Sequence, residues 1–166
     1  MLNVGNPVIN ALVFIFPAYC ANAVPVIFGG GHQLDCGRLF ADGKPIFGSN
    51  KTVRGFVSGL AVGTLVGFAM SLLNIGYSVL LGFVVSLGAL SGDLGEAFVK
   101  RRLGFVPGAA FPVADQLDFV VGALVFSLIV SPPSLLVAGV VIIVTPPIHL
   151  LTNFLAYRMG VKKEPW

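Results

Sequence analysis

Residues 55–73 read GFVSGLAVGTLVGFAMSLL, and no side chain in this stretch is ionisable. A helix of ~20 apolar residues is long enough to cross the ~30 Å hydrocarbon core of a bilayer. Gly55, Gly59, Gly63 and Gly67 recur at every fourth position, so they share one face of such a helix. Small residues on one face let a neighbouring helix approach closely in a membrane. The stretch therefore predicts a membrane-spanning helix that packs through its glycine face.

Apolar stretches of similar character lie on both sides of it, at 8–28, 76–92, 117–130 and 134–157. The whole chain is 56% hydrophobic and only 10% charged, which is far from the composition of a water-soluble globule. We therefore expect an all-α integral membrane protein with about five transmembrane helices. At 166 residues the chain is expected to form one domain, residues 1–166.

The ten Lys and Arg residues are confined to three polar segments, at 29–54, at 93–116 and after residue 157. Cytoplasmic loops are enriched in Lys and Arg, so these segments predict one cytoplasmic face. The N-terminus is then expected outside and the C-terminus in the cytoplasm of a multi-pass protein of the cell (plasma) membrane. The basic residues form short groups between apolar runs, so nucleic acid is not an expected partner. Arg158, Lys162 and Lys163 are interpreted as anchors to anionic headgroups.

Ionisable residues follow directly on the third apolar stretch. If the helix continues past Gly92, the spacing of Asp93, Glu96 and Lys100 places them on one helical face. Glu96 and Lys100 alone fit an ordinary ion pair at an aqueous helix end. Asp93 does not, because it is expected near or below the membrane interface, where ionisable groups are costly and usually functional.

Two further carboxylates, Asp115 and Asp118, lie at the start of the fourth stretch. One interpretation is helix capping, with Asp115 as the N-cap and Asp118 at the third helical position. The functional alternative is that Asp93 and Asp118 converge from different helices on a divalent metal. Carboxylate oxygens suit Mg²⁺, which commonly takes one or two carboxylates together with substrate phosphates.

The loop before the second stretch has the composition of a phosphate-binding segment. Gly48, Asn50, Lys51 and Arg54 there offer backbone N–H groups and two cations at a helix start. The alternative is that the cations are membrane anchors. Together with the carboxylates, these residues supply what phosphoryl or nucleotidyl transfer requires, which is charge neutralisation and positioning of phosphates at one membrane face.

These residues also resemble a known family. Asp93, the Glu96-x-x-x-Lys100-Arg101 run and the Asp115-Gln116-Leu117-Asp118 run resemble the C-terminal signature of the CDP-diacylglycerol synthases, or phosphatidate cytidylyltransferases. The loop motif at 47–55, the small size and the five spans are more similar to the archaeal branch, the CDP-archaeol synthases. There are departures, since Gln116 stands where the broader signature has Arg, and 106–109 lacks its Lys-Asp and His-Gly-Gly elements.

The resemblance implies an enzyme of phospholipid biosynthesis that depends on Mg²⁺. Such an enzyme transfers a cytidylyl group from CTP to a membrane lipid phosphate and releases pyrophosphate. The lipid implied is unsaturated archaetidic acid, 2,3-bis-O-geranylgeranylglyceryl phosphate, and the product is a CDP-archaeol-type lipid. The partners implied are therefore CTP, the lipid phosphate and membrane lipids, and a homodimer is left open.

The expected roles divide the residues into two sets. The metal set consists of the carboxylates Asp93, Asp118, Glu96 and Asp115. The phosphate set consists of Gly48, Asn50, Lys51, Arg54, Lys100 and Arg101. Asp93, Asp118 and Lys100 are expected to be catalytic.

Two other functions are alternatives to this one. A CDP-alcohol phosphotransferase is also small, helical and metal-dependent, but its Asp-Gly-x-x-Ala-Arg opening fails after Asp42-Gly43. A small membrane transporter subunit would place ligands near the bilayer midplane on broken helices, whereas this chain keeps its charges at one face.

Overall fold

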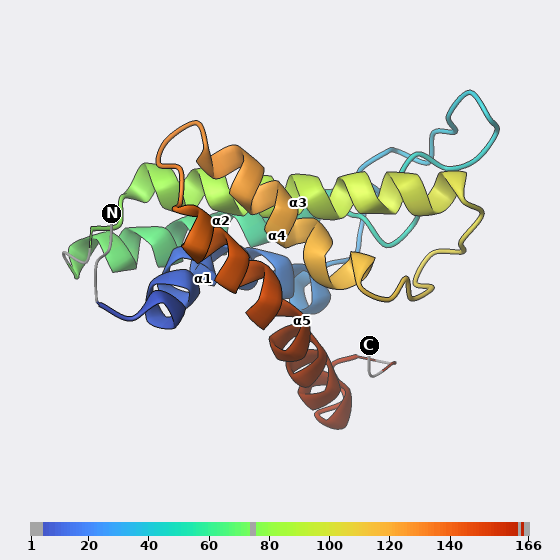
Figure 1. The fold of residues 1–166 in the computed structure, drawn as a ribbon. Helices are drawn as coiled ribbons and strands as arrows, with labels where there is room; N and C mark the ends of the chain where they lie inside the picture. Colours follow the sequence, from blue (N-terminus) through green and yellow to red (C-terminus); the bar gives the residue numbers. More distant parts are fainter. Residues whose placement is uncertain (1–4, 74–75, 163, 165–166) are drawn as a thin grey trace.

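The computed structural model describes residues 5–73, 76–162 and 164, and within them the chain forms a bundle of five helices (Figure 1). They are α1 (Pro7–Phe28), α2 (Val53–Leu72), α3 (Val79–Arg102), α4 (Ala114–Ser127) and α5 (Leu135–Arg158). By length and composition, α1, α2, α3 and α5 can each cross a membrane. α4 has 14 residues, so it is only about 21 Å long. The predicted all-α membrane fold is confirmed, with four helices long and apolar enough to cross a membrane and one short helix where a fifth span was expected.

Local capping fixes where most helices begin. The side chains of Asn6, Thr52, Ser78 and Ser134 accept backbone N–H groups at the starts of α1, α2, α3 and α5. Such caps satisfy donors that have no partner within the helix.

The start of α4 corrects the capping interpretation. Its N-cap is Val113, at φ 69°, which makes no side-chain capping bond. Asp115 lies in the first turn instead of at the cap, and its Oδ2 accepts the N–H of Phe111 at 2.9 Å. The carboxylate thus stabilises the preceding loop in place of the helix end.

The third helix continues well past the apolar stretch at 76–92. It ends at Arg102, and Gly104 follows at φ +85°, a conformation that favours glycine. Good helix formers such as Leu94, Ala97 and Lys100 occupy this extension. Asp93, Glu96 and Lys100 therefore lie on one continuous helix, as their spacing requires.

The glycine face of α2 packs against two helices at once. A Cβ atom on Gly63 would lie 2.2 Å from Ser86 Oγ of α3, and one on Gly67 would lie 2.5 Å from the Gly82 Cα. A Cβ on Gly59 would lie 2.6 Å from the Ala21 oxygen of α1. No larger side chain fits at these distances, so the glycines allow the close approach that the sequence predicted.

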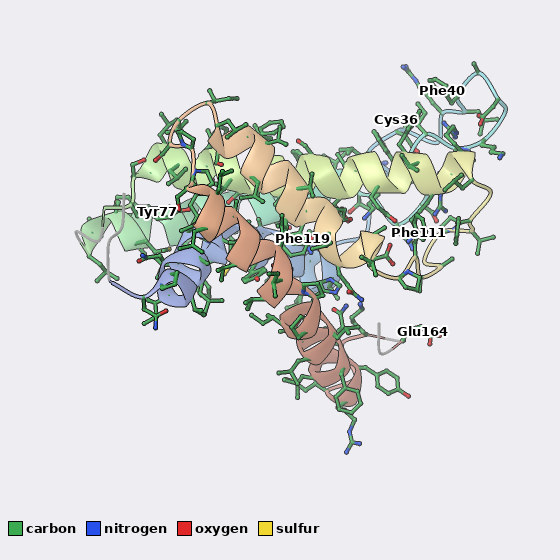
Figure 2. The ribbon with its side chains drawn as sticks, in the orientation of Figure 1. Cys36, Phe40, Tyr77, Phe111, Phe119 and Glu164 are labelled. Atoms are coloured by element: carbon green, nitrogen blue, oxygen red, sulfur yellow. The ribbon has the colours of Figure 1, made fainter. Side chains whose placement is uncertain are left out.

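The polar loops gather at one end of the bundle. The loop between α1 and α2, which contains Cys36, and the loop between α3 and α4, which contains Phe111, lie at this end (Figure 2). Tyr77, in the connection between α2 and α3, lies at the opposite end (Figure 2). The C-terminal half of α5 extends beyond the bundle (Figure 1). Phe119 of α4 is fully buried, and its ring packs at a tilt against that of Tyr19 of α1, with 5.7 Å between the ring centroids.

Candidate active site

A cavity of about 1060 Å³ lies where the polar loops meet the helices. Residues from all five helices, from both polar loops and from the segment after α5 line it. Part of the wall is apolar, with Phe16, Val26 and Ile148 among its residues. The charged residues in the wall are Lys51, Asp93, Glu96, Lys100, Arg101, Asp115, Asp118, Lys162 and Glu164.

Asp93 of α3 forms an ion pair with Lys51 from the loop before α2. The Lys51 Nζ donates to both carboxylate oxygens of Asp93, at 2.6 and 2.7 Å. Each side chain is about a quarter exposed, at 26% and 24%. Burial alone would lower the pKa of Lys51, but the neighbouring carboxylates, first of all Asp93, raise it above its ordinary value. Asp118 and Glu96 raise the pKa of Lys51 further, so three carboxylates favour its charged form.

Asp118 is brought beside Asp93 by an unusually close contact between α3 and α4. A Cβ atom on Gly92 would lie 2.2 Å from the Asp118 backbone oxygen, and one on Gly122 would lie 2.1 Å from the Gly88 oxygen. Because Gly92 directly precedes Asp93, this contact places carboxylates from two helices next to the same cavity.

A second cluster of charges surrounds Lys100. This residue is 7% exposed, and its Nζ lies 2.8 Å from Asp115 Oδ1 and 3.4 Å from Glu96 Oε1. The contact between Lys100 and Asp115 joins the end of α3 to the start of α4. Lys100 is therefore held between two carboxylates at the cavity wall.

Arg101 differs from the two lysines because it has no anionic partner among the described residues. It is 5% exposed, and its Nε and Nη1 atoms make no hydrogen bond within the described part of the chain. Gly48 from the first polar loop lies close to its side chain, since a Cβ on Gly48 would lie 3.6 Å from Arg101 Nη1 and 3.4 Å from Pro107 of the second polar loop. A buried cation without a partner in a cavity wall is a strong indication of an anionic ligand.

Of the remaining predicted residues, one lines the cavity and two do not. Asn50 lines the cavity beside Lys51. Gly48 is packed against Arg101 just behind the lining. Arg54 is exposed in the first turn of α2 and is not among the described residues that line the cavity. The structure thus brings together all the predicted site residues except Arg54.

For one cation in the cavity wall, Lys162, the sequence predicts a different role. Lys162 was interpreted as a headgroup anchor, yet it lines the cavity, and burial lowers its pKa. Gly160, at φ +73°, reverses the chain after α5, and the N–H of Lys162 bonds to the Ala156 oxygen. Gly160 is the one local sequence feature in this segment that indicates the reversal. Lys163 lies outside the described residues.

The donor set fits a hard divalent cation that is also bound by substrate. The described residues contain no group of three or more His, Cys, Asp or Glu side chains arranged to hold a metal. Asp93 and Asp118 nevertheless supply carboxylate oxygens from two helices at one cavity wall. Mg²⁺ typically uses one or two carboxylates and completes its shell with water and substrate phosphates, so this sparse set suits it.

Comparison with known proteins assigns the family. A family model described as "CarS-like: CDP-archaeol synthase" matches residues 4–166. The chain belongs to the CDP-archaeol synthase family. The CDP-archaeol synthase of Methanococcoides burtonii is 41% identical, with 92% of this chain and 100% of that protein covered. The CDP-archaeol synthase of Pyrococcus furiosus is 43% identical, with 97% and 99% covered.

A solved structure has a similar fold. It is described as an intramembrane enzyme for archaeal membrane lipids biosynthesis, and it matches with a TM-score of 0.80 and 36% sequence identity. The match covers 88% of this chain and 94% of that chain. Membership of the CDP-archaeol synthase family confirms the predicted resemblance and the enzyme class, a cytidylyltransferase of lipid biosynthesis. It sets aside both the phosphotransferase and the transporter alternatives.

Proposed function

We propose that the cavity transfers the cytidylyl group of CTP to the phosphate of unsaturated archaetidic acid, and that it uses Mg²⁺. The products are a CDP-archaeol-type lipid and pyrophosphate. Family membership supports the reaction, and the charged wall of the cavity supports its location in this chain.

The observation that carries this location is the buried Arg101 without an anionic partner. Lys51 and Lys100 are neutralised by carboxylates, but the Arg101 guanidinium is not neutralised by any described residue. A bound phosphate would supply the missing charge and accept the unpaired N–H groups. The cavity is therefore complementary to a polyphosphate that reaches the end of α3.

The reaction depends mainly on neutralising the negative charge of the two reactants. An oxygen of the lipid phosphate attacks the α-phosphorus of CTP and forms a new P–O bond. The bond from the α-phosphorus to the bridging oxygen breaks, and pyrophosphate leaves with that electron pair. The attacking oxygen is already anionic, so it needs little help from a base, but the two reactants repel each other. Lys51, Lys100 and Arg101 counter this repulsion in a partly dehydrated cavity.

Asp93 and Asp118 would hold the metal, and Glu96 and Asp115 would lie beside it. When bound, Mg²⁺ supplies further positive charge at the phosphate oxygens. Lys51 contacts both oxygens of Asp93, so its ammonium is placed to bind a phosphate oxygen of a nucleotide held at that carboxylate. Lys100 is similarly placed by Asp115.

The membrane orientation is part of the proposal. All ten Lys and Arg residues lie in the three polar segments, so we place the polar end of the bundle in the cytoplasm of the plasma membrane. CTP then reaches the cavity from the cytoplasm, while the lipid phosphate reaches it from the inner leaflet.

Transfer of label from CTP tests the reaction. Purified protein is incubated with Mg²⁺, ether-linked lipid phosphate and CTP labelled at either the α- or the γ-phosphate. We expect α-label in the organic phase and γ-label in pyrophosphate. Entry of γ-label into lipid, or equal failure of both labels to enter it, would contradict the proposal. An ester-linked lipid phosphate in a parallel reaction measures the preference for the lipid backbone.

A further inference from the structure

Asp35 is a buried carboxylate that lies outside the cavity wall. It is 6% exposed and forms no ion pair with any described residue. Instead it accepts three backbone N–H groups, from Gly37 at 3.0 Å, Phe47 at 2.9 Å and Gly48 at 3.0 Å. Burial alone would raise the pKa of Asp35, but these N–H groups lower it below its ordinary value. The carboxylate is therefore charged and fully engaged with the backbone.

These hydrogen bonds fix the segment 47–52 against the segment 33–35. The N–H of Leu34 donates to the Lys51 oxygen at 2.8 Å, and Gln33 and Thr52 form an antiparallel bridge. Asp35 adds the second attachment, at Phe47 and Gly48, on the other side of the turn. The segment that carries the cavity residues is thus held at both its ends.

The same bonds decide which donors remain for a ligand. The N–H groups of Phe47 and Gly48 are used by Asp35, so they are not available to a phosphate. Ser49 and Asn50 line the cavity, and within the described part of the chain neither makes a hydrogen bond through its backbone N–H or its side chain. Lys51 follows them directly. The donors without a partner are therefore those of Ser49 and Asn50, between the two attachments, while the Lys51 Nζ is held by Asp93.

We propose that Asp35 is a positioning residue for the cytidylyl transfer, because it holds segment 47–52 so that Ser49, Asn50 and Lys51 present their donors to a substrate phosphate. This inference rests on the proposed function. Asp35 acts through the loop, since its hydrogen bonds within the described residues all come from backbone N–H groups and Asp35 itself does not line the cavity. The outer part of the same loop is held separately, by an ion pair of 2.8 Å between Asp42 and Arg102.

The first test compares Asp35→Asn with Asp42→Asn. Asparagine keeps the shape of Asp35 but removes its charge and turns an amide N–H₂ toward backbone donors. We expect the KM for CTP to rise ~10- to 100-fold, because hydrogen bonds to charged groups contribute this much, with kcat changed less than about threefold. Asp42→Asn should stay within about twofold of wild type, because its partly exposed ion pair contributes little. A wild-type KM in Asp35→Asn would overturn the inference.

A double-mutant cycle separates positioning from general stabilisation. If Asp35 acts by placing Lys51, Asp35→Asn should reduce kcat/KM much less in a Lys51→Gln background than in wild type. An equal reduction in both backgrounds would overturn the inference.

Should Asp35→Asn fail to fold, Gly48→Ala disturbs the same segment with Asp35 intact, because Gly48 has φ +95°. We expect the same rise in KM there, and a wild-type KM would again overturn the inference.

Different results would contradict the proposed function and the positioning role of Asp35. Full transfer activity in Asp93→Asn would contradict the metal assignment whatever Asp35 does. An inactive Asp93→Asn together with a normal Asp35→Asn would contradict only the positioning role.

Discussion

At the scale of single residues, the site is defined by which charges are neutralised within the protein. Lys51 and Lys100 each have a carboxylate within 2.8 Å, whereas Arg101 is as buried as Lys100 and has no such partner in the described chain. A buried unpaired charge destabilises a folded protein. Its presence in the cavity wall is therefore best explained by a ligand that pairs with it.

Arg101→Met tests this explanation. We expect the variant to melt at the same temperature as wild type or higher, because an unpaired buried charge is removed. Affinity for CTP should fall by ~1.5–3 kcal/mol, the contribution of hydrogen bonds to a charged group. Thermal unfolding and CTP titration measure the two effects. Arg158→Met, at the exposed end of α5, is the matched control and should bind CTP normally. Normal CTP affinity in Arg101→Met would contradict the phosphate role.

The Lys51–Asp93 pair makes a prediction about pH. The pKa of Lys51 is raised, so the contribution of its charge to stability is complete below the ordinary lysine pKa of about 10.4 and is lost only as the pH rises through the higher folded value. Lys51 should therefore stay charged between pH ~6 and ~9, within which activity is measured. Wild type and Lys51→Arg should show pH–rate profiles of the same shape. An alkaline limb in this range that Lys51→Arg removes would show that Lys51 titrates there.

At the scale of helices, the close contact between α3 and α4 builds the carboxylate site. Gly92 and Gly122 let the two backbones approach, and this approach places Asp118 beside Asp93. Any side chain at Gly92 must push α4 away, because its Cβ would lie 2.2 Å from the Asp118 oxygen.

Gly92→Ala and Gly95→Ala form a matched pair on the same helix. We expect Gly92→Ala to lose stability by ~1–3 kcal/mol through overpacking and to lose most of its transfer activity, because Asp118 is displaced. A Cβ at Gly95 meets nothing within 4 Å, so Gly95→Ala should keep its activity. Thermal unfolding in detergent and the label-transfer assay measure both. Equal activity in the two variants would show that the contact does not position the site.

The sequence predicted the long spans well because an apolar run of this length is a local signal. It also predicted the shared face of Asp93, Glu96 and Lys100, once α3 continues to Arg102. Of its two interpretations of Asp115, the N-cap of α4 is wrong, because the contacts of Asp115 with Phe111 and Lys100 form only in the folded chain.

Tertiary structure also decided which cations reach the cavity. Arg54 and Lys51 are three residues apart, but the helix that starts at Val53 carries Arg54 to the exposed surface. Lys162 reaches the cavity wall only because the chain reverses at Gly160. Neither outcome follows from the spacing of charges along the sequence.

At the scale of the whole molecule, the bundle has one end with the charged loops and one end whose described residues carry no charged side chain. The two polar loops lie together at the end where the cavity is, away from the connection that contains Tyr77 (Figure 2). This polarity allows a water-soluble nucleotide and a membrane lipid to meet at one site, provided that the polar end faces the compartment that holds CTP.

Labelling of Cys36 tests that orientation. Cys36 is exposed in the first polar loop, while Cys20 lies half-buried in α1. A membrane-impermeant maleimide should therefore label the protein in inverted vesicles and leave it unlabelled in right-side-out vesicles. Cys36→Ser should remove the signal. Labelling of Cys36 in right-side-out vesicles would place the site outside the cell.

The most direct measurement is the rate of cytidylyl transfer by Asp93→Asn and Asp118→Asn, each verified as folded, at saturating CTP, Mg²⁺ and ether-linked lipid phosphate. If carboxylates from α3 and α4 jointly hold the metal that binds the nucleotide, both variants should lose nearly all turnover, and chelation of divalent cations should abolish turnover in wild type. Unchanged turnover in either variant, or turnover that persists with chelator, would contradict this account of the site.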